Sequence, residues 1–259
     1  MYAGGTDVLV KLRAHKLAAK HIIDVKGIPT FCDITLHNGI LRIGCAVTLT
    51  DIARHPLVKA VAPALREGCN QVGSVPIRNK ATLIGNIQNA SPAADGLNAA
   101  WGLDARVVLV SKGGERRIPL EQYVLGPGRT AILQDEAAAY IELPTKEWDY
   151  QEFFKTGRRR ALAISIINGM AAFKFNEEHA VENVRLCVGA VAATPLRLAA
   201  AEQVLLGKII TPQLAEQAAG VAIGSISPIT DIRAAADYRR YIAGVEIQRQ
   251  ITRAMEIFL

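Results

Sequence analysis

The stretch from Ala81 to Asp95 has the composition of a ligand-binding loop. It holds too many small and hydrogen-bonding residues for a core strand, and too few charges for a solvated loop. Glycine lets a ligand approach the backbone closely, while Asn, Ser and Thr side chains supply hydrogen bonds. The positions of this kind are Thr82, Gly85, Asn86, Asn89, Ser91 and Asp95.

A second stretch of the same kind opens the chain, from Tyr2 to Asp7. Gly4-Gly5-Thr6-Asp7 directly precedes an apolar pattern typical of a helix, whose first N–H groups would lack intrahelical acceptors and could face an anion. Taken alone, this segment is more often a turn that starts a helix. Beside the first stretch, it predicts that both loops bind one phosphate-containing cofactor.

The composition is that of an ordinary globular protein, long enough for one large or two modest cores. Half of the 259 residues are hydrophobic, and the formal net charge is +6. The longest basic run is Arg158-Arg159-Arg160, and no basic face alternates with aromatic residues. We therefore expect no nucleic-acid partner.

Metal, catalytic and membrane signals are weak. The cysteines Cys32, Cys45, Cys69 and Cys187 lie far apart without a C-x-x-C pair, which predicts free buried thiols and no zinc or iron–sulfur site on this chain. The histidines are scattered, so we assign no catalytic residue. Without a signal peptide or an apolar run of membrane-spanning length, we expect a cytoplasmic protein with no membrane span.

The elements that must position these loops begin with a helix after Asp7 and a short buried strand over His21–Val25. They form half of an α/β unit whose first strand would precede Met1, so the N-terminal part is expected to be shortened. Asn38-Gly39 lies between two alternating apolar runs, 34–37 and 40–44, and predicts a hairpin because both turn positions need positive φ.

A helix is expected over 51–67, capped by Thr48 or Thr50 and interrupted at Pro56 and Pro63. The other elements expected up to residue 147 are a helix over 97–103 and strands over 105–110, 116–119 and 140–143.

From Trp148 the pattern changes to longer strands followed by helices, so we place a boundary at 145–150, with domains over 1–147 and 148–259. Short strands joined by turns, with helices at the ends, predict an α+β fold with antiparallel sheets. The expected elements are strands over 152–155, 161–167, 170–175 and 184–191, helices beginning at Thr194-Pro195 and Thr211-Pro212, and a long helix over 237–255.

These motifs together resemble the FAD-binding (medium) subunit of molybdenum hydroxylases, the group of xanthine, carbon monoxide and nicotinate dehydrogenases and 4-hydroxybenzoyl-CoA reductase. The resemblance is collinear over essentially the whole chain. It rests on Ala3–Asp7 and Ile77–Asp95 as two FAD loops, on Gly126–Thr130, on Lys155 with Arg158-Arg159, and on Ser227–Arg233 with Tyr238-Arg239-Arg240 as a C-terminal signature.

The resemblance implies an FAD-binding domain of the vanillyl-alcohol-oxidase-like (PCMH) type with two α/β subdomains, followed by a C-terminal domain of antiparallel sheet and helices. FAD would lie on this chain, with the molybdenum cofactor on a large partner subunit and [2Fe–2S] clusters on a small one, in a dimer of heterotrimers. Electrons from substrate oxidation on the large subunit would pass through the clusters to the flavin, and then to NAD⁺ or another acceptor.

The resemblance also implies a role for each site residue. The FAD pyrophosphate would be wrapped by the N–H groups of Ala3, Gly4, Gly5, Thr6 and Asp7. Phosphate or ribitol would contact Thr82, Gly85 and Asn86. Asp95 would accept a hydrogen bond from a cofactor hydroxyl, although it could equally cap the helix near Leu97. Lys155 would lie beside the isoalloxazine, where a cation stabilises reduced flavin.

Some alternatives stay open. Ile84 stands where the family usually has glycine: a side chain that points away from the cofactor would change little, whereas a positive φ would weaken FAD binding. Arg158–Arg160 could be a solvated turn, and Arg233, Arg239 and Arg240 fit salt bridges or a subunit interface better than flavin contacts. The whole chain could also be a free-standing FAD oxidoreductase, or a scaffold subunit that has lost FAD.

Overall fold

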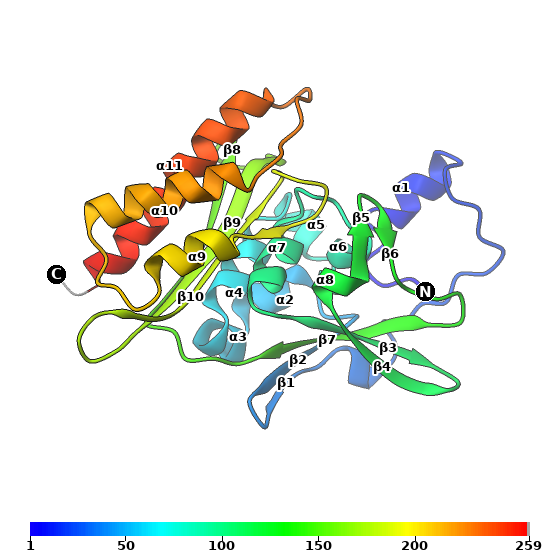
Figure 1. The fold of residues 1–259 in the computed structure, drawn as a ribbon. Helices are drawn as coiled ribbons and strands as arrows, with labels where there is room; N and C mark the ends of the chain where they lie inside the picture. The colour runs from blue at the N-terminus through cyan, green and yellow to red at the C-terminus, as the bar shows by residue number, and fades with distance from the viewer. Residues whose placement is uncertain (258–259) are drawn as a thin grey trace.

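The structure is a computed structural model that describes residues 1–257, in which two sheets and two layers of helices alternate (Figure 1). The first sheet has the order β1-β2-β7-β3-β4 with antiparallel neighbours. The predicted hairpin is confirmed: Asn38 and Gly39 have φ of 48° and 72°. The strands are β1 (Ile34–His37), β2 (Ile40–Gly44), β3 (Arg106–Ser111), β4 (Gly114–Pro119) and β7 (Ala137–Pro144).

A layer of short helices covers this sheet. The predicted interruptions of the 51–67 helix are confirmed, because Pro56 and Pro63 each begin a new helix, at the position where a missing N–H costs nothing. Thr48 caps the first piece by accepting a hydrogen bond from Asp51 N (3.1 Å). The helices are α2 (Leu49–Arg54), α3 (Pro56–Val61), α4 (Pro63–Asn70), α5 (Val75–Arg78), α6 (Leu83–Gln88), α7 (Asp95–Gly102) and α8 (Leu120–Tyr123), with the small hairpin β5 (Val124–Gly126) and β6 (Arg129–Thr130) beside them.

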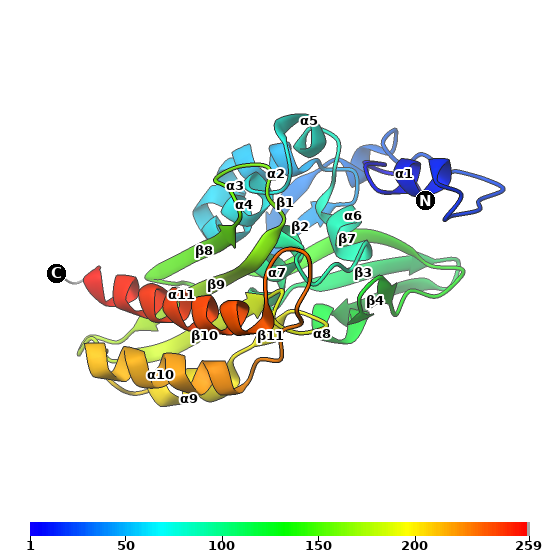
Figure 2. The same ribbon diagram turned by 90° about the horizontal axis from the view of Figure 1, so that it is seen from above.

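The second sheet has the antiparallel order β11-β10-β9-β8, and three helices cover its outer face (Figure 2). This arrangement confirms the α+β class and the expected sheet-and-helix C-terminal region. The strands are β8 (Tyr150–Gly157), β9 (Ser165–Phe175), β10 (Val181–Gly189) and β11 (Leu196–Arg197), and the helices are α9 (Ala199–Leu205), α10 (Pro212–Gly224) and α11 (Ala236–Glu256).

Three expected elements are wrong. His21–Val25 is not a buried strand: only Val25 is buried, and the segment makes a single bridge, between Asp24 and Tyr2, beside α1 (Val8–Arg13) and the 3₁₀ turn η1 (Pro29–Phe31). The strands expected over 161–167 and 170–175 are one strand, β9, which begins only at Ser165. Pro195 precedes β11, so no helix begins there. Cys32 is exposed, whereas the other cysteines are buried as expected.

The core of the first sheet extends into the second. Phe153, Met170 and Cys187 of the second sheet belong to the same buried cluster as Leu65 of α4 and Leu97 of α7. Helices α4 and α7 therefore lie between the two sheets: their side chains share the core of the first sheet, and the helices contact the second (Figure 1). Within residues 1–257, no helix is long and apolar enough to cross a membrane.

Candidate functional site

The two loops singled out from the sequence meet in the structure. The backbone of Gly4 packs directly against the segment before Thr82: a Cβ on Gly4 would lie 2.3 Å from the Lys80 carbonyl oxygen and 2.8 Å from Ala81 Cα. Gly5 has φ of 72°, a conformation that favours glycine. Gly4 therefore lets the two loops approach this closely, and Gly5 provides the backbone turn of the first loop.

A hollow of about 340 Å³ opens where the loops meet, and we call it the first hollow. All the residues that the resemblance assigns to the phosphate and ribitol part of the cofactor line it, namely Ala3, Gly4, Gly5, Thr6, Asp7, Thr82, Gly85 and Asn86. Within the described chain, no acceptor pairs with the backbone N–H groups of residues 3–7. These unpaired donors fit an anion.

The side chains of the second loop hold its helices in place. Thr82 Oγ1 accepts a hydrogen bond from Gly85 N (3.1 Å) and so caps α6. Asn86 Oδ1 accepts one from Leu97 N (2.9 Å), which ties α6 to the first turn of α7. Ile84 lies inside α6 with a negative φ, and its buried side chain lines the first hollow. The positive φ that would weaken FAD binding at this position is therefore absent.

A larger hollow of about 650 Å³, the second hollow, adjoins the first. Gln71 and Gly73 line the second hollow, and Val72 between them lines the first. Leu162 of the β8–β9 loop also lines the second hollow. Ile77 and Arg78 of α5 are divided in the same way, so neighbouring positions of the chain line the two hollows.

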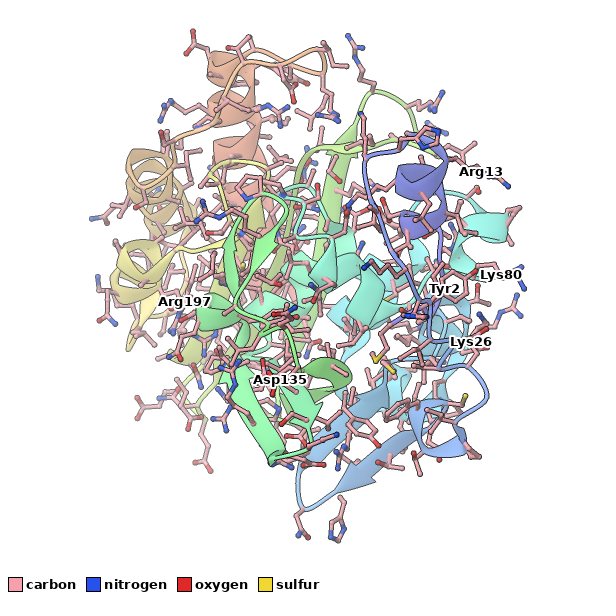
Figure 3. All side chains as sticks on the ribbon, turned by 90° about the vertical axis from the view of Figure 1, so that its right-hand side faces the viewer. Tyr2, Arg13, Lys26, Lys80, Asp135 and Arg197 are labelled. Atoms are coloured by element: carbon pink, nitrogen blue, oxygen red, sulfur yellow. The ribbon has the colours of Figure 1, made fainter. Side chains whose placement is uncertain are left out.

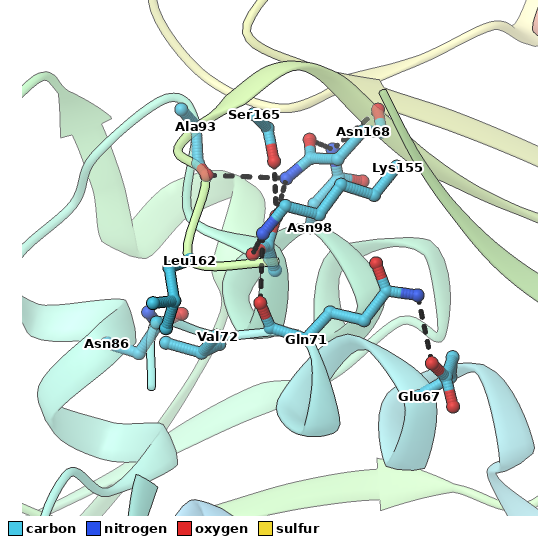
Figure 4. Close-up of polar contacts among 12 residues, drawn as sticks. Glu67, Gln71, Val72, Asn86, Ala93, Asn98, Lys155, Leu162, Ser165 and Asn168 are labelled. Atoms are coloured by element: carbon cyan, nitrogen blue, oxygen red, sulfur yellow. Dashed lines mark hydrogen bonds and ion pairs between the residues drawn. The ribbon is translucent and has the colours of Figure 1, made fainter. Parts of the chain in front are cut away.

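Lys155 of β8 lines the second hollow and forms a buried ion pair with Asp95, the first residue of α7 (Figure 4). Its Nζ donates to Asp95 Oδ2 (2.5 Å) and to the Gln71 carbonyl oxygen (2.9 Å). An ammonium has three N–H donors, so one remains for the hollow.

Asp95 is not among the described residues that line either hollow. Its Oδ1 accepts hydrogen bonds from Ser165 Oγ (2.6 Å) and Asn168 Nδ2 (2.7 Å). The N-cap of α7 is Ala94, so Asp95 lies one residue inside the helix rather than capping it. Its carboxylate is surrounded by side chains from β8 and β9.

The rim of the second hollow is basic. Arg78, Arg159 and Arg160 line it, and the one acidic residue of the described lining is Glu67, which accepts a hydrogen bond from Gln71 Nε2 (2.9 Å). Arg159 donates two hydrogen bonds to the Leu162 carbonyl oxygen, which hold the loop after β8 in a turn. Arg158–Arg160 are thus exposed, and Arg159 and Arg160 also line the second hollow.

The expected salt bridges of the C-terminal signature are confirmed for Arg233 and Arg239, which both bind Asp231 (2.7 Å each). Arg240 instead donates to two backbone carbonyl oxygens.

Sequence reasoning missed several lining residues. Lys11 of α1 lines the first hollow, and its spacing of four residues from Asp7 on a helix was an available signal. Gln71, Val72 and Leu162 carry no motif and could not have been found. Lys26 supports the first loop from behind, donating to the Ala3 carbonyl oxygen (3.2 Å) with its Nζ 4.2 Å from the Tyr2 ring centroid (Figure 3).

Comparison with known families gives two matches that together cover most of the chain. The family described as "FAD binding domain in molybdopterin dehydrogenase" matches residues 1–146. The family described as "CO dehydrogenase flavoprotein C-terminal domain" matches residues 152–254. Both FAD loops lie within the first match, and Lys155 lies within the second.

Individual relatives agree. The chain is 31% identical over 258 residues to the xanthine dehydrogenase FAD-binding subunit of Escherichia coli O157:H7, covering 98% of this chain and 88% of that one. Among solved structures, it is similar to a chain of quinoline 2-oxidoreductase from Pseudomonas putida 86, with a TM-score of 0.93 at 25% identity. It is also similar to a chain of carbon monoxide dehydrogenase from Hydrogenophaga pseudoflava, with a TM-score of 0.91 at 27% identity.

Both structural matches cover 98% of this chain and 88% of the other. The chain therefore belongs to the FAD-binding medium subunits of the molybdopterin dehydrogenase family, the flavoprotein subunits of oxidoreductases of the xanthine and carbon monoxide dehydrogenase type.

Proposed function

We propose that this subunit carries electrons through an FAD that extends along both hollows. The observation that supports this proposal is the junction of the two glycine loops, because it presents unpaired backbone N–H groups to the first hollow, while a buried lysine lines the second. The diphosphate would lie against Ala3–Asp7, the ribitol side against Thr82, Gly85 and Asn86, and the ring towards Lys155.

When bound, FAD supplies redox chemistry that no side chain of this chain can perform. The residues bind, orient and charge-stabilise it. Lys155 would direct its remaining N–H into the second hollow, where a cation favours the reduced, anionic ring. The resemblance gave Asp95 a direct cofactor contact. Since Lys155, Ser165 and Asn168 already donate to its carboxylate, we propose that Asp95 acts by positioning Lys155.

The partners would be a large subunit with the molybdenum cofactor and a small subunit with [2Fe–2S] clusters, assembled as a dimer of heterotrimers. The solved relative from Hydrogenophaga pseudoflava is described as lacking one moiety of its molybdenum cofactor, which supports such a partner here. The substrate would bind on that large subunit. The basic rim of Arg78, Arg159 and Arg160 supports a phosphate-bearing acceptor such as NAD⁺.

An absorption spectrum of the purified chain, before and after incubation with FAD and desalting, tests the proposal. We expect the two flavin bands of the near-ultraviolet and visible regions. A chain that stays colourless after incubation would overturn the proposal and favour a scaffold subunit. A yellow chain that oxidises a small substrate without partner subunits would favour the free-standing oxidoreductase instead.

A further inference from the structure

Lys11 is the one lysine or arginine in the described lining of the first hollow. It extends from α1, and its Nζ donates to Oδ1 of Asn89, the C-cap residue directly after α6 (2.8 Å). The ammonium thus spans from α1 to α6 at the edge of the hollow. It holds together the two segments whose loops meet there.

The charge of Lys11 is not neutralised by its partner, because the Asn89 amide is uncharged. Lys26 differs: it lies behind the first loop and pairs with Asp24 (2.9 Å). The described lining also includes two acids, Asp7 and Glu136. The Glu136 carboxylate is already bound by Arg116 (2.8 Å) and by the backbone N–H of Leu133 (2.8 Å).

A diphosphate brings negative charge that backbone N–H groups can hydrogen-bond but cannot neutralise with a formal charge. Lysine serves such groups as a compact point charge with three rotatable donors. One donor of Lys11 binds Asn89, which leaves two for phosphate oxygens without loss of the existing contact.

We propose that Lys11 is the cation of the diphosphate site, shared between Asn89 and the phosphates, and that it fastens α1 to α6 around the bound cofactor. This inference rests on the proposed binding of FAD to this chain. Lys11 adds a positive charge to the diphosphate site, where Ala3–Asp7 otherwise offer only backbone N–H groups and the Asp7 carboxylate.

The test is a titration of the whole 259-residue chain with FAD, followed by flavin fluorescence, in Lys11→Met and in the matched control Lys16→Met. Lys16 is exposed near the same helix end and is not part of the described lining. We expect Lys11→Met to weaken FAD binding roughly tenfold, as for a lost hydrogen bond to a charged group. Lys16→Met should leave the Kd unchanged within about twofold, as for an exposed charge.

Two further measurements separate charge from packing. Competition by ADP, which carries the diphosphate without the flavin, should weaken by a similar factor in Lys11→Met. Added salt should raise the Kd of the unaltered chain more steeply than that of the variant. Circular dichroism checks that each variant is folded.

The two possible failures are distinguishable. If the unaltered chain binds no FAD, the proposed function and this inference both fall. If it binds FAD and Lys11→Met matches Lys16→Met in Kd and salt dependence, only the role of Lys11 is overturned.

Discussion

At the scale of single residues, the Asp95–Lys155 pair is the costliest contact in the site to break. Both side chains are buried, with exposed fractions of 6% and 9%. Loss of one partner of a buried ion pair leaves the other charge without compensation, which costs more than the pair contributes when intact. Lys155 comes from β8 and Asp95 from α7. The pair therefore also joins the region that matches the FAD-binding family to the region that matches the C-terminal family.

We therefore predict that Asp95→Asn lowers the free energy of unfolding by about 3 kcal/mol. The double variant Asp95→Asn with Lys155→Met should recover part of this loss, because it removes the stranded ammonium as well. Urea titrations of the two single variants and the double variant measure the coupling. Strictly additive losses would show that the two charges do not depend on each other.

The same pair shows what could be predicted from the sequence at this scale. Asp95 and Lys155 were both identified, but as separate cofactor contacts. Their bond joins positions 60 residues apart, and the bonds of Asp95 to Ser165 and Asn168 span 70 and 73. Side-chain pairs across such separations follow from how a helix packs on a sheet, and no local pattern records that.

At the scale of elements, the close approach of the two loops gives a direct test of the site. Gly4→Ala would place a Cβ 2.3 Å from the Lys80 carbonyl oxygen, so the loops must separate. Gly27→Ala is the matched control, since its Cβ would meet nothing within 4 Å. We predict that Gly4→Ala weakens FAD binding at least about tenfold, through displacement of donors that must be held in place. Equal Kd values for the two variants would contradict the two-loop site.

A second element, α11, is held by a pH-sensitive anchor. Burial of the Asp231 carboxylate opposes ionisation, but hydrogen bonds from Arg233 and Arg239 outweigh burial and hold its pKa well below the usual range. Arg239 is buried, and it also donates to the backbone carbonyl oxygens of Ile166 and Ala190. Arg239 thus ties the start of α11 to the second sheet, and Asp231 holds its guanidinium by an ion pair.

Because the folded pKa of Asp231 is lowered, its stabilisation is complete above the ordinary value of 3.8 and is lost as the pH falls through the folded pKa. We predict that Asp231→Asn is less stable than the unaltered chain at neutral pH, and that this gap narrows below pH 3.8. Urea unfolding at a series of pH values measures it, with the exposed Asp135→Asn as control. A gap that is constant with pH would contradict the role of the Asp231 charge.

Elements with local signals could be predicted, and those set by tertiary contacts could not. Asn38-Gly39, Pro56, Pro63 and the period of α11 located their elements. The apolar run 161–167 looked like a strand, yet Leu162 has φ of 57° and its carbonyl oxygen is bound by Arg159, so β9 begins later. Ala161, Leu162 and Ala163 line the second hollow instead of extending β9.

At the scale of the whole molecule, the domain boundary expected near residue 147 stays a prediction, and the packing shows how closely the two sides are joined. Helices α4 and α7 contribute to the core of the first sheet and contact the second. A Cβ on Gly102 at the end of α7 would lie 2.3 Å from Met170 Sδ on β9. The candidate site also involves both sides of this boundary, because residues of α6 line the first hollow and residues of β8 line the second.

Such a shared core should make the chain unfold as one unit. We predict that tryptophan fluorescence and far-ultraviolet circular dichroism follow a single, coincident urea transition. Met170→Ala, which removes a fully buried side chain of the second sheet, should lower the stability by about 3 kcal/mol and shift both signals together. Trp101 reports on this coupling because it lies on α7. If the dichroism transition moved while the fluorescence transition stayed in place, the second sheet would unfold independently of α7, which would contradict the shared core.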